Sequence, residues 1–135
     1  MITIYHNFQF LKYAGDCYTT KEADRTPLGK ITVTAVAHVE TNSLEEAYRL
    51  TNNTDKSWED NTAKVKTIGS AKRYFSFPER DECLRSTSVG DILQDTNGAF
   101  HVVEPLFRFR KLSPEEIEGI TFYTISKQEE AKLNG

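Results

Sequence analysis

Hydrophobic and polar residues alternate along two stretches of the chain, which is the pattern of β-strands with one buried face. In residues 2–10 an isoleucine or phenylalanine occupies four of the five even positions, and in residues 31–39 an apolar residue occupies every odd position. The polar, glycine-containing stretch 13–30 between them predicts a loop. Ala35 and Ala37 are small, which indicates that another element packs closely against the second strand.

A helix is predicted to begin at Ser43. The Ser43 hydroxyl can accept from a free amide of the first turn while Glu46 reaches back to the Ser43 amide, which is a capping box. Glu45 and Arg49 lie four residues apart on its outward face, a favourable spacing for opposite charges. The asparagine pair at 52–53 is predicted to end this helix, which we expect to be the main one.

The clearest turn pattern is Asn97-Gly98, which lies between apolar runs at 92–93 and 99–103. Both residues tolerate the positive φ values of a tight hairpin turn, so we expect a hairpin in which both adopt them. The Gly-Asp pair at 90–91 predicts a second turn or a bulge before the first strand.

Pro105 cannot donate a ladder hydrogen bond and predicts a bulge or an edge position. Phenylalanine and arginine then alternate over 107–110, so the rings should face one way and the guanidinium groups the other. The Ser-Pro-Glu-Glu run at 113–116 predicts a short helix, and 121–125 a strand followed by a terminal helix.

Together these elements predict a single domain, 1–135, of the α+β class: a twisted antiparallel sheet of about five strands with one main helix packed on one face and short C-terminal helices. A half-barrel similar to small SH3-like or PUA-like barrels is the alternative arrangement. For residues 65–68 and 73–77 the sequence does not decide between a loop and a short strand.

The formal net charge of −3 argues against nucleic-acid binding by the whole surface. Residues 61–111 carry nine Lys or Arg against six Asp or Glu, which keeps a local anion site open. Two cysteines far apart, Cys17 and Cys83, are typical of a reduced, intracellular protein. With no signal peptide and no apolar run near the roughly 20 residues of a membrane span, we expect a soluble protein without membrane contact.

The sequence contains no motif for a metal ion or another cofactor, and we predict none. Three histidines fall in predicted strands, where a structural or surface role is favoured over a metal cluster: His6, His38 and His101. Cys83 lies between Arg80 and Arg85, cations that could activate a thiol. No signature pairs it with a histidine, so a structural cysteine is favoured over a nucleophile.

Arg85, Ser86 and Ser88 offer a guanidinium, hydroxyls and backbone amides in one short run, which suits an anionic group such as phosphate or carboxylate. Alternatively the hydroxyls cap a turn while Arg85 pairs with Asp91 or stacks on Trp58.

Arg73, Arg108 and Arg110 are interleaved with aromatic residues. This pattern suits single-stranded nucleic acid, whose bases stack on rings and whose phosphates pair with cations. It is also typical of a strand with its rings in the core and its arginines in water, which is the favoured interpretation.

The segment RSTSVGD at 85–91 leads into the hairpin, downstream of a helix that ends in Thr51-Asn52 and of Trp58. It resembles a signature in a loose group of small proteins encoded by phages and plasmids, over about residues 31–110. The chain departs from the group at 106–107, where Gly-Phe or Gly-Trp is more usual than Leu-Phe. The resemblance implies an accessory protein of a mobile element that acts in the host cytoplasm.

The leading hypothesis is therefore a non-catalytic accessory protein, of the anti-defence or host-takeover type, that binds and modulates a host macromolecule, with a host protein as the favoured target and inhibition as the expected effect. The contact surface is predicted to include an acidic flank or Trp58, Arg85, Ser86, Ser88 and Asp91. The alternative is a small module for single-stranded nucleic acid or a nucleotide, which would use Arg73, Arg85, Arg108 and Arg110. An enzyme of unknown class is the third hypothesis.

Overall fold

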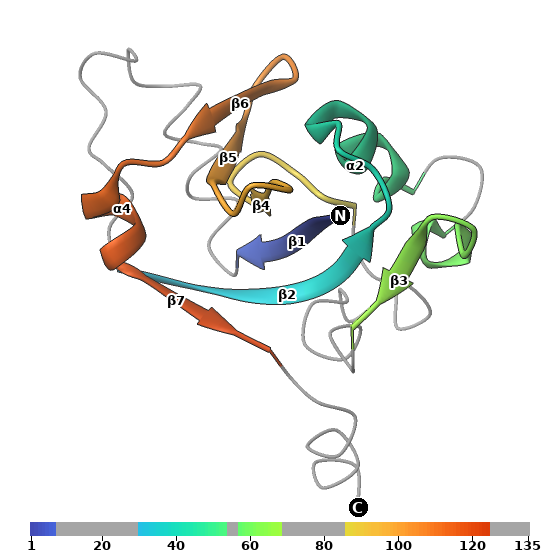
Figure 1. Ribbon diagram of the computed structural model, residues 1–135, viewed down its shortest axis with the longest axis horizontal. Helices are drawn as coiled ribbons and strands as arrows, with labels where there is room; N and C mark the ends of the chain where they lie inside the picture. The colour runs from blue at the N-terminus through green and yellow to red at the C-terminus, as the bar shows by residue number, and fades with distance from the viewer. Residues whose placement is uncertain (8–29, 54–56, 69–85, 125–135) are drawn as a thin grey trace, which may run out of the picture.

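The structure is a computed structural model that describes residues 1–7, 30–53, 57–68 and 86–124 (Figure 1). Within these ranges the chain forms seven strands: β1 (Ile2–Asn7), β2 (Ile31–Val39), β3 (Val65–Thr67), β4 (Ile92–Gln94), β5 (Phe100–Glu104), β6 (Arg108–Lys111) and β7 (Ile120–Tyr123). The described helices are all short: α2 (Leu44–Leu50), the 3-10 turn η2 (Trp58–Asp60) and α4 (Pro114–Glu118).

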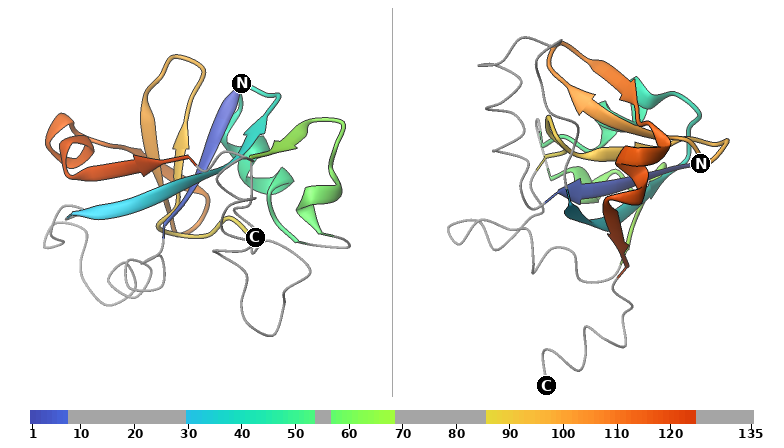
Figure 2. Two further views of the ribbon diagram at one scale, coloured as in Figure 1. Left: turned by 90° about the horizontal axis from the view of Figure 1, so that it is seen from below. Right: turned by 90° about the vertical axis from the view of Figure 1, so that its left-hand side faces the viewer.

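The strands form one sheet in the order β3-β2-β1-β4-β5-β6, in which neighbours on this path are antiparallel. The long strand β2 also carries β7, which runs parallel to its first part and begins where Ile120 lies opposite Ile31. The sheet is strongly curved, and α4 connects the end of β6 to the start of β7 (Figures 1 and 2). The curl places α2 and η2 on one face of the sheet and α4 on the other.

The α+β class and the mostly antiparallel sheet are confirmed, but the details of that prediction were wrong. The sheet has seven strands instead of about five, because β3 and β6, of three and four residues, also pair into it. The strand expected at 121–125 is β7, and it pairs in parallel. The expected main helix has only seven residues against five in α4. Residues 8–10, 73–77 and the predicted terminal helix lie outside the described ranges.

A β-bulge bends β2 at its centre. Ile4 of β1 lies opposite Ala37 and Tyr5 lies opposite Ala35, so Val36 has no partner in the register. Such an extra residue bends a strand and increases its twist, and β2 is visibly curved (Figure 1). Val36 itself is fully buried, so the strict alternation expected over 31–39 fails here.

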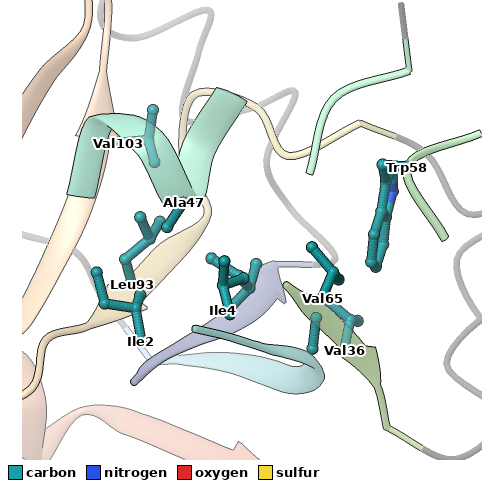
Figure 3. Close-up of a cluster of buried hydrophobic side chains, with 10 residues drawn as sticks. Ile2, Ile4, Val36, Ala47, Trp58, Val65, Leu93 and Val103 are labelled. Carbon is teal, nitrogen blue, oxygen red and sulfur yellow. The ribbon is translucent and has the colours of Figure 1, made fainter. Parts of the chain in front are cut away.

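Two hydrophobic clusters cover the two faces of the sheet. The first lies under α2 and η2, and its side chains converge from five strands and both helical segments (Figure 3): Ile2, Ile4, Val36, Ala37, Val39, Ala47, Trp58, Val65, Leu93 and Val103. The second lies under α4: Val33, Ile92, Val102, Leu112 and Ile120. Ala37 of β2 and Ala47 of α2 both belong to the first cluster. Because both faces are buried, the consecutive pairs Ile92-Leu93 in β4 and Val102-Val103 in β5 are buried and apolar.

The β4–β5 hairpin is confirmed, with a different turn from the one expected. Gly98 alone has a positive φ, +88°, and its amide donates to the Asp95 carbonyl at 3.1 Å. Asn97 keeps a negative φ, and its amide donates to the Asp95 carboxylate at 2.8 Å. The three-residue loop closed by a left-handed glycine is a common alternative to the two-residue turn. Asp95 therefore fixes the turn from within.

Serine caps begin both α-helices as predicted. Ser43 accepts from the Glu46 amide at 3.2 Å, but the Glu46 carboxylate binds Lys64 at 2.9 Å instead of completing a capping box. Ser113 and Glu116 do form the complete box at the start of α4. The start of each helix was therefore readable from local sequence alone.

Candidate functional site

The serine-rich segment 86–91, here called the clasp, meets the end of α2 and the Trp58 turn. The Asn53 amide donates to Ser86 Oγ at 2.8 Å, and the Thr87 amide donates to the Thr51 carbonyl at 2.9 Å. The Trp58 amide in turn donates to Asn53 Oδ1 at 2.9 Å. Two segments some thirty residues apart are thus joined through Asn53.

The interior of the clasp is organised by Asp91, which is fully buried. Its carboxylate accepts from the Asn7 amide at 2.8 Å and the Ser88 amide at 2.7 Å, while Asn7 Nδ2 donates to the Gly90 carbonyl at 3.1 Å. Gly90 has a φ of +99°, and its turn was correctly predicted. These bonds satisfy a buried charge and attach the clasp to the end of β1.

Trp58 is also fully buried, with its indole in the first hydrophobic cluster (Figure 3). Its ring centroid lies 6.3 Å from that of His6, which is itself buried and has Nε2 3.0 Å from Thr87 Oγ1. Trp58 and Asp91 therefore face the interior and hold the clasp in place. Ser86 and Ser88 are partly exposed, and Arg73 and Arg85 lie outside the described residues.

Arg110 joins β6 to α4 and β5. Its Nη1 lies 2.8 Å and its Nη2 3.1 Å from the Glu116 carboxylate, and its Nε lies 3.2 Å from Glu104 Oε1. Both carboxylates are buried, so one guanidinium neutralises two of them. Arg108 is exposed on β6 and lies opposite Glu104. As predicted, both arginines point away from the face that Phe109 covers.

The three histidines occupy separate places. His38 on β2 lies 3.1 Å from Thr3 Oγ1, and burial, together with the Lys66 cation, lowers its pKa. His101 Nε2 lies 2.9 Å from Asp95 Oδ2, and this hydrogen bond lowers the pKa of the Asp95 carboxyl. The residues that the structure describes contain no group of three or more His, Cys, Asp or Glu side chains able to hold a metal ion.

An exposed apolar tip closes the β5–β6 hairpin. Leu106 and Phe107 have φ values of +65° and +57°, and their relative exposures are 88% and 66%. A left-handed backbone costs a residue with a Cβ about 1–2 kcal/mol, and two such residues in succession are rare. The tip therefore combines backbone strain with two large apolar side chains in water. Functional sites are where such strain is commonly found.

A groove of about 540 Å³ runs between this tip and the outer side of α2. The Phe107 ring forms one wall and stands edge-on to Tyr48 of α2, with centroids 5.7 Å apart and planes at 87°. Phe109 packs on Tyr48 in the same manner at 6.0 Å. Glu45 and Arg49 line the groove from the helix. Its size is in the range of sites for small molecules and peptide side chains.

The tip was not predicted as a functional site from the sequence. The available signal was a proline turn followed by two large apolar residues, Leu106 and Phe107, where turns usually carry polar residues or glycine. That pattern was attributed to a strand with its rings in the core, and only Phe109 fits this attribution.

Comparison with protein-family models, curated proteins and solved structures finds no match to this chain. No helix among the described residues combines the length and the apolar character needed to cross a bilayer. Function is therefore inferred from the geometry of the clasp, the tip and the groove.

Proposed function

We propose that this chain is a non-catalytic accessory protein of a mobile element that binds and modulates a host protein in the host cytoplasm. The observation that carries the proposal is the tip, where Leu106 and Phe107 are exposed on a strained backbone. Burying each of these side chains against a partner would stabilise a complex by about 1.5–3 kcal/mol. In the free protein the left-handed backbone of both residues costs stability.

A binding role also fits the state of the polar groups. The His6, Thr87 and Asp91 side chains, the nearest resemblance to a catalytic constellation, are buried and hydrogen-bonded within the clasp. His6 Nε2 faces both Thr87, at 3.0 Å, and Asp91, at 3.9 Å, whereas a triad needs the acid on the other ring nitrogen. These residues join the clasp to the end of β1, and the partner contact is assigned to the tip.

The experiment is affinity capture from host lysate with the wild type and two variants. Leu106→Asp places a charge at the tip, and Thr96→Asp is the matched control at the exposed β4–β5 turn, at the other end of β5. We expect one protein to be retained by the wild type and by Thr96→Asp and to be lost with Leu106→Asp.

Nuclease treatment of a parallel sample should leave this capture unchanged. Retention of the same protein by Leu106→Asp, or recovery of no specific protein, would contradict the proposal. Capture that disappears with nuclease would instead support the nucleic-acid alternative.

A further inference from the structure

The groove beside the tip presents one open charge of each sign on its helical wall. Glu45 and Arg49 are both exposed, and within the described ranges neither forms an ion pair. The neighbouring Glu46 is different, because its carboxylate is bound by Lys64 Nζ at 2.9 Å. Glu45 and Arg49 therefore offer a carboxylate and a guanidinium that a ligand can pair with.

The spacing of these charges matches an extended peptide. Four residues of helix separate Glu45 from Arg49 by about 6 Å along the axis. Alternate side chains of an extended segment lie about 6.6 Å apart on the same side. A segment lying along α2 would thus place residues i and i+2 opposite the two charges.

The other wall of the groove is apolar. Residue i+1 of an extended segment points away from α2, toward Phe107 of the tip. Phe107 is 66% exposed even though one side of its ring contacts Tyr48, so it retains surface for a further apolar side chain. One wall of the groove is therefore charged and the other is apolar. Side chains of an extended segment point alternately to opposite sides, so each would face one of the two walls.

We propose that the groove binds an extended segment of the partner protein with the pattern basic, apolar, acidic. The basic residue pairs with Glu45, the acidic residue pairs with Arg49, and the apolar residue between them packs against Phe107. This inference rests on the proposed function and names the segment that the partner must present.

The test is a set of NMR titrations of the full chain with capped five-residue peptides, Gly-X-Leu-Z-Gly, in which X-Z is Lys-Glu, Lys-Lys or Glu-Glu. A fourth peptide, Gly-Lys-Gly-Glu-Gly, lacks the apolar residue. We expect the Lys-Leu-Glu peptide to bind roughly two- to fivefold more tightly than the Lys-Lys and Glu-Glu peptides, the range for one exposed charge pair. It should also bind more tightly than the peptide without leucine, which loses the apolar contact. Shifted amides should lie in 44–50 and 106–109.

Charge reversal supplies the decisive control. Arg49→Glu should move the preference to the Lys-Leu-Lys peptide, and Glu45→Lys should move it to the Glu-Leu-Glu peptide. Preferences that stay the same in both variants, equal binding of all four peptides, or shifts confined to other residues would overturn the inference. If a host protein is captured in a Leu106-dependent manner but none of the peptides binds, the basic-apolar-acidic pattern is refuted and the proposed function is not. Peptide binding without any captured protein would refute the proposed function.

Discussion

Replacing Leu106 with glycine should stabilise the protein. The left-handed φ of +65° costs a residue with a Cβ about 1–2 kcal/mol, and glycine escapes this cost. Glycine in turn loses roughly 0.5–1 kcal/mol through its greater freedom in the unfolded chain. Because Leu106 is 88% exposed, almost no burial is lost. The net expectation is a gain of about 0.5–1 kcal/mol in the free energy of unfolding.

Urea unfolding and calorimetry measure this gain. For a chain of this length the melting temperature should rise by about 2–4 °C, and the urea midpoint should rise without a change in slope. Leu106→Ala is the matched control, because it removes the same exposed side chain and keeps the Cβ that causes the strain. If the glycine variant is no more stable than the alanine variant, the strain assigned to the tip is wrong.

Three further predictions concern the contacts beneath the surface. Arg110→Ala should reduce the free energy of unfolding by about 2–4 kcal/mol in a denaturant titration, since two buried carboxylates lose their shared cation; an effect below about 1 kcal/mol would contradict the network. Asp91→Ala should cost about 3 kcal/mol by the same assay, because two buried amides lose a charged acceptor, and an unchanged midpoint would exclude the structural role of the clasp. The depressed pKa of Asp95 means that its stabilisation is present above the ordinary carboxyl pKa and is lost as the pH falls through the folded value. His101→Gln should therefore flatten the loss of stability between pH 7 and pH 3, and an unchanged pH profile would argue against this pair.

Local patterns were sufficient to predict much of the fold. Alternation identified β1 and β2, the Ser43 and Ser113 hydroxyls identified the helix starts, and the glycine at 98 identified the hairpin. Each of these signals acts over a few residues, so tertiary structure has little opportunity to override it.

Structural features that depend on contacts between residues far apart in the sequence could not be predicted. The bulge at Val36 lies in a run of buried residues, and such a run does not reveal which residue lacks a partner on β1. Asp91 was predicted to lie on the contact surface, yet it is fully buried and accepts from the amide of Asn7, 84 residues away. The strain at Leu106 is a property of the hairpin geometry and leaves no trace in composition.

The most direct measurement of the central claim is photo-cross-linking in host cells, with p-benzoylphenylalanine in place of Phe107. The control carries the same residue in place of Tyr123, an aromatic side chain that is 48% exposed on β7. We predict one dominant cross-linked host protein from position 107 and none from position 123. Cross-links of equal yield from both positions, or a protein cross-linked from position 123 alone, would contradict the assignment of the tip as the contact surface.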